Sequence, residues 1–407
     1  MPDRKSDRRC PPPYVPHDKS SAKPAAQCHT PPAQGAHGGE IYRVARELGV
    51  APEAILDCGS NGFSQAEDLT RALVAAEPYP FEHYPDPDST ALRQRLALAE
   101  GVTPGQLLAG NGSSELIWLV LRVLQPARVT LLGPTFSEYA RACDAHGIPW
   151  RVLHADPAHA LDISPAGSAP PPDDAQRELV VLCSPGNPCA IAAPDLPALV
   201  AHLARQGYGT VLVDLTYRDF LWGQPEYAGH RWQALTGACA TETTVLGLHS
   251  FTKFFHCTGI RLGYLAGPEP LLARLHKARP PWMVSPYAEA MGQRFLDALP
   301  AYRERLPDLR ADRAALLRAA RATGLFDPDA MLEGTSFLTC RLHPGLLARG
   351  VTSGAARAQL LRQHVLVRDC DNIPGMPPGY LRMQARPERD EERLAKALRH
   401  TAQTLNG

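Results

Sequence analysis

The sequence has no long hydrophobic run, no excess of either charge and no closely paired cysteines. No apolar stretch approaches the roughly 20 residues that a membrane helix needs. The 42 Lys and Arg residues balance the 42 Asp and Glu residues, so no general positive field exists to attract the backbone of a nucleic acid. These absences disfavour a membrane protein and a nucleic-acid binder, and they indicate a small-molecule partner.

Cysteine is present, but its spacing signals neither a metal site nor a disulfide framework. The ten cysteines include no C-x-x-C pair, which favours structural free thiols. The first 36 residues lack the apolar core of a secretory signal peptide. We therefore expect no metal and a reducing, cytoplasmic location.

The length of 407 residues predicts two to three structural units, and the composition changes near residue 37. Residues 1–36 contain clustered prolines and few large apolar side chains, so we expect a disordered leader. Apolar residues at helical spacing over 40–48 then mark the start of the fold. We divide the rest into an N-terminal segment (37–80) that joins a smaller domain, a large ligand-binding domain (81–285) and a C-terminal small domain (286–407).

Short apolar runs alternate with helical patterns in the large domain. The runs lie at 129–132, 179–183, 210–213, 245–248 and 262–266. These runs are continuously apolar and are separated by amphipathic helical stretches such as 113–124 and 196–205. They therefore predict an α/β domain with a mostly parallel sheet flanked by helices. After residue 285, helical patterns and two strand-like runs predict a smaller α+β domain. The helical patterns lie at 287–299, 312–322 and 390–405, and the runs lie at 336–341 and 381–384.

The strongest chemical signal is Lys253, which follows the apolar run 245–248 in the segment Ser250-Phe251-Thr252-Lys253. A lysine at a strand end can form a Schiff base with an aldehyde. The hydroxyl of Ser250 and the guanidinium of Arg261 suit a phosphate dianion. The combination points to pyridoxal phosphate, although a single lysine after a strand is more often solvated surface.

Three upstream segments strengthen this interpretation. Gly110–Glu115 opens a predicted helix, whose N-terminus can hold a phosphate. Ser184–Pro188 follows a strand and offers an amide to a phenolic oxygen. Asp214 ends another strand, where a buried carboxylate would keep a pyridine nitrogen protonated, and Tyr217 lies three residues on. Each segment alone can be an ordinary cap or turn, so their order along the chain carries the inference.

From residue 37 to the last helix, the chain resembles fold-type I pyridoxal-phosphate enzymes of the aspartate aminotransferase superfamily. The resemblance is to the branch that contains histidinol-phosphate aminotransferase and threonine-phosphate decarboxylase. The features closer to the decarboxylase are His37-Gly38-Gly39, Tyr84-Pro85-Asp86, Ala109-Gly110-Asn111-Gly112, Pro281-Trp282-Met283-Val284, and Arg382 with Arg386. The resemblance implies a seven-stranded type of sheet, pyridoxal 5'-phosphate bound by the large domain, and a homodimer with its sites at the subunit interface.

The resemblance also implies roles for individual residues. Lys253 would form the Schiff base, Asp214 would pair with the pyridinium, and Tyr217 would complete the catalytic set. The other cofactor contacts would be Gly112, Ser113, Ser114, Phe136, Asn187, Ser250, Arg261 and, from a second subunit, Tyr84. The substrate would be bound by His37, Gly38, Asn187, Arg382 and Arg386.

The chain departs from the family pattern around the expected cofactor. The departures are Cys189-Ala190 after Asn187-Pro188, Leu215-Thr216 after Asp214, His256 and Cys257 after the lysine, and Glu40 after His-Gly-Gly. Thr216 would lie beneath the cofactor ring. His256 and Cys257 can be packing residues or an additional acid or base. Glu40 would place a negative charge near the region where the decarboxylase binds its phosphorylated substrate.

We therefore predict an enzyme that forms an external aldimine with a polar or anionic L-amino acid, with phosphorylated or otherwise substituted amino acids included. The bond at Cα that lies perpendicular to the cofactor ring is the one that breaks. Decarboxylation is favoured, and aminotransfer of the histidinol-phosphate type is the alternative. A repurposed enzyme of specialised metabolism, catalysing elimination, substitution or oxidative deamination, stays open. A non-catalytic cofactor-binding module is disfavoured because Lys253 and Asp214 are both present.

Overall fold

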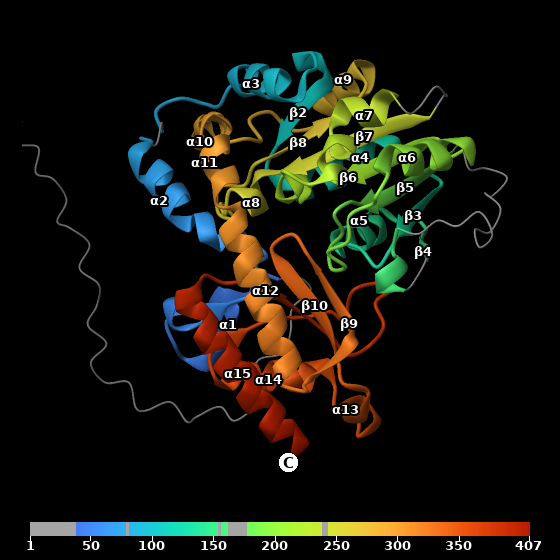
Figure 1. Cartoon of the computed structure of the whole chain (residues 1–407). Helices are drawn as coiled ribbons and strands as arrows, with labels where there is room; N and C mark the ends of the chain where they lie inside the picture. Colours follow the sequence, from blue (N-terminus) through green and yellow to red (C-terminus); the bar gives the residue numbers. More distant parts are fainter. Residues whose placement is uncertain (1–37, 79–80, 154–155, 162–176, 238–242) are drawn as a thin grey trace, which may run out of the picture.

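The computed structural model describes residues 38–78, 81–153, 156–161, 177–237 and 243–407 (Figure 1). The predicted disordered leader and His37 lie outside the described residues. In Figure 1 a large sheet with its helices forms the upper part of the molecule, and a small sheet with its helices forms the lower part. No helix in the described ranges is long and apolar enough to cross a membrane.

The large sheet has seven strands in the order β2-β8-β7-β6-β5-β3-β4. They are β2 (Leu107–Gly110), β3 (Arg128–Leu132), β4 (Trp150–Leu153), β5 (Glu178–Cys183), β6 (Thr210–Asp214), β7 (Thr244–Ser250) and β8 (Gly263–Ala266). Only β8 runs antiparallel to its neighbours among these strands. The mostly parallel sheet is therefore confirmed.

Helices cover both faces of the large sheet, which is why its strands are continuously apolar. They include α3 (Thr90–Glu100), α4 (Gly112–Leu124), α5 (Glu138–His146), α6 (Leu196–Arg205), α7 (Trp232–Gly237), α8 (Phe251–Phe254) and α9 (Glu269–Ala278). Val180 and Val181, adjacent on β5, are both fully buried but belong to different hydrophobic clusters. Since neighbouring strand residues point to opposite faces, one cluster lies on each side of the sheet.

The small domain contains an antiparallel sheet in the order β12-β13-β10-β9. Its strands are β9 (Phe326–Gly334), β10 (Phe337–Leu342), β12 (Arg368–Asp369) and β13 (Tyr380–Gln384). The helices around it include α1 (Ile41–Leu48), α12 (Leu306–Ala322), α14 (Ser353–Arg362) and α15 (Glu388–Asn406). The N-terminal strand β1 (Leu56–Asp57) pairs in parallel with β11 (Val365–Leu366), so these two segments, far apart in the sequence, lie side by side.

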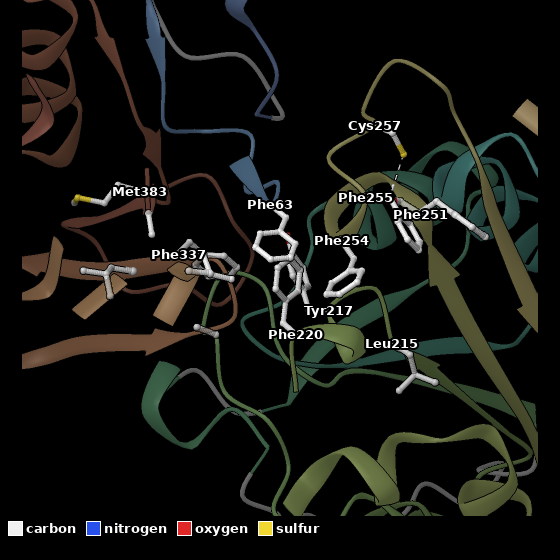
Figure 2. Close-up of a cluster of buried hydrophobic side chains, with 14 of the residues drawn as sticks. Phe63, Leu215, Tyr217, Phe220, Phe251, Phe254, Phe255, Cys257, Phe337 and Met383 are labelled. Carbon is white, nitrogen blue, oxygen red and sulfur yellow. Dashed lines mark hydrogen bonds between the residues drawn. The ribbon is translucent and has the colours of Figure 1, made fainter. Parts of the chain in front are cut away.

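A cluster of buried aromatic side chains joins the two parts of the molecule (Figure 2). The ring of Phe63, which follows β1, lies 5.6 Å from that of Phe220 and 5.4 Å from that of Phe254 on α8. Tyr217 packs edge-on against Phe337 of β10, at 5.5 Å between ring centroids. Burying each such ring contributes roughly 1.5–3 kcal/mol, so the cluster fixes the loop after β1 against the helix after β7.

Candidate functional site

Lys253 lies on α8, at the carboxyl end of β7, where ligands collect in open α/β sheets. The helix begins at Ser250, whose Oγ accepts a hydrogen bond from the Thr252 backbone N–H at 3.3 Å. The Lys253 ammonium donates to the Ser60 carbonyl oxygen at 2.6 Å. Burial, followed by the positive charge of Arg382, lowers the pKa of Lys253 to about 8. A sizeable fraction of the amine is thus neutral, as a nucleophile requires.

Asp214 ends β6 and is 6% exposed. Its Oδ2 accepts from the Tyr139 hydroxyl at 2.9 Å, and its Oδ1 accepts from the Thr216 backbone N–H at 2.9 Å. Burial raises the pKa of Asp214. Within the described part of the chain, the hydrogen-bond donors to this carboxylate are all neutral. A protonated pyridine nitrogen therefore fits here, because a buried carboxylate is stabilised by a cationic partner.

Asn187, Tyr217 and Arg382 meet around the loop that follows β1. The Arg382 guanidinium donates to the Asn187 carboxamide oxygen and, at 3.0 Å, to the Gly59 carbonyl oxygen. The Tyr217 hydroxyl accepts from the Asn61 side chain at 3.5 Å. Burial raises the pKa of Tyr217 to about 12, so its hydroxyl stays protonated and can donate. The structure thus brings three predicted site residues together.

An anion cradle forms where Arg261 meets the N-terminus of α4. A Cβ atom at Gly112 would collide with the Arg261 guanidinium, and one at Gly263 would lie 2.8 Å from the Ser113 backbone nitrogen. Arg261 donates to the Thr252 hydroxyl at 3.4 Å. A guanidinium against the first turn of a helix is suited to a phosphate, and Ser114, another predicted phosphate contact, lies on the same turn.

Other predicted residues lie at the edge of this arrangement. Phe136 packs edge-on against Tyr139, with 6.4 Å between ring centroids, and so lies near Asp214. Tyr84 is 79% exposed and stacks on Trp282 at 4.7 Å. Tyr84 is therefore not part of the buried cluster around the lysine of its own chain.

Two predicted substrate residues, Gly38 and Arg386, border the arginine side of the site. A Cβ at Gly38 would lie 2.9 Å from the Gly59 carbonyl oxygen and 3.7 Å from the Arg382 guanidinium. Arg386 pairs with Asp390 at 2.9 Å. His37, which precedes Gly38 and was also predicted to bind the substrate, lies outside the described residues.

Sequence reasoning missed the contribution of the loop from Asp57 to Gly62. Its carbonyl groups bind Lys253 and Arg382, and burial raises the pKa of Asp57 while the charge of Arg386 lowers it. The sequence did contain a signal for this loop. Asp57 ends a short apolar run, as Asp214 does, and a Gly-, Ser- and Asn-rich loop follows it. Tyr139, the donor to Asp214, was also missed, and no local motif marks it.

His256 occupies a left-handed backbone conformation, with φ of 47°. Its ring packs so closely on Gly62 that a Cβ there would collide with it, and its Nδ1 is buried without a hydrogen-bond partner in the described part of the chain. Burial lowers the pKa of His256 to about 4, so the ring is neutral near pH 7. Burial also raises the pKa of Cys257 to about 12. The surroundings of both side chains are those of packing residues.

We expect Gly62→Ala to lower the free energy of unfolding by about 2 kcal/mol, because the added methyl group overpacks the His256 ring. In a His256→Gly background, the same substitution should cost less than about 0.5 kcal/mol, since the collision is gone. Urea unfolding of the four proteins in this cycle measures both values. An equal cost of Gly62→Ala in both backgrounds would contradict the packing.

We expect Arg382→Met to shift the pH dependence of the rate at which the apoprotein binds pyridoxal phosphate covalently toward higher pH. Removing a positive charge near Lys253 raises the pKa of its amine above about 8, and only the neutral amine attacks an aldehyde. Asp57→Asn should move the profile to lower pH, because Asp57 raises the pKa of Lys253. The rate of absorbance change after mixing gives the profile, with Arg341→Met as the control. A shift of both variants in one direction contradicts this electrostatic account.

The fold and this arrangement define a pyridoxal-phosphate-dependent enzyme. The family model of aminotransferase class I and II matches residues 55–400, and the chain belongs to that family. Its cofactor is pyridoxal 5'-phosphate, and it is a decarboxylase or an aminotransferase that depends on this cofactor.

The chain is similar to curated relatives of both kinds. It is 30% identical to threonine-phosphate decarboxylase of Salmonella typhimurium over 373 residues, which cover 90% of this chain and 96% of the relative. It is 29% identical to histidinol-phosphate aminotransferase of Roseiflexus castenholzii, with 87% and 92% covered.

Among solved structures, the histidinol-phosphate aminotransferase of Clostridium acetobutylicum has a TM-score of 0.69 at 19% identity, covering 86% of this chain and all of that one. A decarboxylase of Sulfurospirillum multivorans has a TM-score of 0.70 at 18% identity, covering 85% and 94%. These two structures share the fold.

Proposed function

We propose that the protein decarboxylates an L-amino acid that carries a second anionic group. The observation that carries this proposal is a pair of arginines, Arg382 within β13 and Arg386 two residues after it, of which Arg382 is 6% exposed. One arginine suffices for an α-carboxylate, so a second one nearby suits a second anion. The similarity to threonine-phosphate decarboxylase over 90% of the chain further supports decarboxylation.

The bound cofactor supplies an aldehyde that captures the substrate amine and a ring that accepts electrons from Cα. Lys253 would hold the cofactor and would return a proton to Cα of the substrate. Asp214 would keep the proton on the pyridine nitrogen. Asn187 and Tyr217 would donate hydrogen bonds to the phenolic oxygen, and Phe136 would pack on the ring. The phosphate would be held by Gly112, Ser113, Ser114, Ser250 and Arg261.

Aminotransfer is the second candidate, and a specific contact favours it. Arg382 donates to the Asn187 carboxamide, so a carboxylate that binds both residues would lie near the cofactor plane. That orientation leaves the Cα–H bond perpendicular to the ring, and a proton is lost in place of CO₂. The angle of the bound carboxylate decides between the two reactions.

A mass balance separates these reactions. Amino acids with neutral, carboxylate and phosphate side chains are incubated with the loaded enzyme, with and without 2-oxoglutarate. The proposal predicts CO₂ from an anionic substrate without need of 2-oxoglutarate. Glutamate formation that requires 2-oxoglutarate, with no CO₂, overturns decarboxylation in favour of aminotransfer, and ammonia points to elimination or oxidative deamination.

The exposed aromatic residues support a homodimer whose site is completed by Tyr84 of a second subunit. Phe81, Tyr84 and Trp282 line a surface hollow together with Arg261 of the anion cradle. Large exposed apolar side chains gathered around a ligand site are typical of an interface. Analytical ultracentrifugation should show twice the 44.2 kDa chain mass. A monomer at micromolar concentration that binds cofactor fully would contradict the dimer.

A further inference from the structure

Gln384 lies on β13 between the two arginines assigned to the substrate. Side chains alternate along a strand, so Arg382 and Gln384 share one face, and Leu381 and Met383 point into the hydrophobic core on the other. Two residues along a strand span about 6.7 Å. Gln384 is therefore one pleat beyond Arg382, toward Arg386.

The side chain of Gln384 is fully buried, and its orientation is determined by hydrogen bonding. Its Oε1 accepts from the Gly62 backbone N–H at 3.2 Å and from the Ser60 hydroxyl at 3.0 Å. Because a backbone N–H can only donate, the oxygen must face Gly62, and the amide nitrogen must face the other way. The same residue, Ser60, accepts from Lys253, so the carboxamide borders the lysine.

The amide nitrogen of Gln384 is buried and has no hydrogen-bond partner among the described residues. The Nε atoms of Arg382 and Arg386 share this property. A buried donor without a partner costs about 1–3 kcal/mol. Two of these donors lie on β13, and the third lies two residues after its end. Three buried donors that are positive or neutral suit a ligand that presents negatively charged oxygen atoms.

We propose that Gln384 is a specificity-determining residue that donates its Nε2–H to the distal anionic group of the substrate, beside Arg386. This inference rests on the proposed anionic substrate. Arg382 is turned toward Asn187 and Gly59 and takes the α-carboxylate, so the position one pleat further meets the other end of the substrate. The arginine attracts an anion, and the neutral amide donor adds a hydrogen bond of defined direction. Substrates whose side chain has no acceptor at this position leave the donor unpaired and bind more weakly.

The test measures binding of two probes that lack an amino group, so that no turnover occurs. Isothermal titration calorimetry compares 3-phosphonopropanoate with butanoate on the full-length, cofactor-loaded protein. Gln384→Glu retains the acceptor bonds to Gly62 and Ser60 but replaces the donor by a negative oxygen. Gln384→Met removes the carboxamide at similar volume. Gln293→Met on α10 (Pro286–Asp297), outside the site, is the matched control.

A hydrogen bond to a charged group is worth roughly 10- to 100-fold in affinity. We therefore expect Gln384→Met to weaken 3-phosphonopropanoate at least tenfold, Gln384→Glu to weaken it more, and both to change butanoate less than about threefold. Equal weakening of both probes, or none, overturns the assignment, because the amide then serves the α-carboxylate, the fold or a buried water. A wild-type protein that does not prefer 3-phosphonopropanoate overturns the anionic substrate itself, and the role of Gln384 with it.

Discussion

Lys253→Ala is expected to reduce turnover by at least about 10³-fold and to abolish the covalent attachment of pyridoxal phosphate. Lys253 lies buried at the end of β7, and burial lowers the pKa of its amine to about 8. A lysine exposed to solvent keeps its ordinary pKa and does not replace Lys253 as the nucleophile. Absorbance spectra of the purified proteins with added cofactor, together with initial rates, measure both effects.

Lys277→Ala on α9 is the control, because Lys277 is an exposed lysine. It should leave the spectrum and the rate unchanged. A Lys253→Ala protein that retains the wild-type band would show that the cofactor is attached elsewhere.

Asp214→Asn is expected to lower turnover by about 10³-fold while the protein stays folded. Asparagine has the same shape, because its oxygen can accept from the Thr216 backbone N–H while its amide nitrogen donates to the Tyr139 hydroxyl. It carries no negative charge, however, so it does not hold a proton on the pyridine nitrogen, and the ring accepts electrons poorly.

The absorbance of the bound cofactor and its dissociation rate check this without turnover. Asp195→Asn serves as the control, since either residue caps the N-terminus of α6. Unchanged turnover in Asp214→Asn would remove Asp214 from the site.

The strands of the large sheet were predictable because they are buried on both faces. The run 179–183 differs from β5 by one residue, and the predicted helix at 196–205 coincides with α6. Strands β2 and β4, at the two edges of the sheet, were missed. Strand β2 is only four residues long and ends in glycine, and β4 has half-buried side chains that include Arg151. Helix α12 begins at Leu306, earlier than the helical pattern from Asp312 predicts, because Pro307 is tolerated in a first turn.

Some residues of the site were also predictable from the sequence, and others were not. Lys253, Asp214 and Arg261 lie at strand ends or in turns that a local pattern marks, so the sequence could single them out. Gln384 and the hydroxyl of Ser60 come into contact only when the loop after β1 reaches β13, more than 300 residues later. Contacts between segments so far apart have no local signature. His256 was noticed as a departure, but its packing on Gly62 needed the folded chain.

The attachment of the cofactor to Lys253 is tested most simply by locating the cofactor on the chain. The loaded protein is reduced with borohydride, digested, and analysed by peptide mass spectrometry. We expect a phosphopyridoxyl group on Lys253, in the peptide that contains Ser250, and on no other lysine. A group on a different lysine, or none at all, would contradict the site described here.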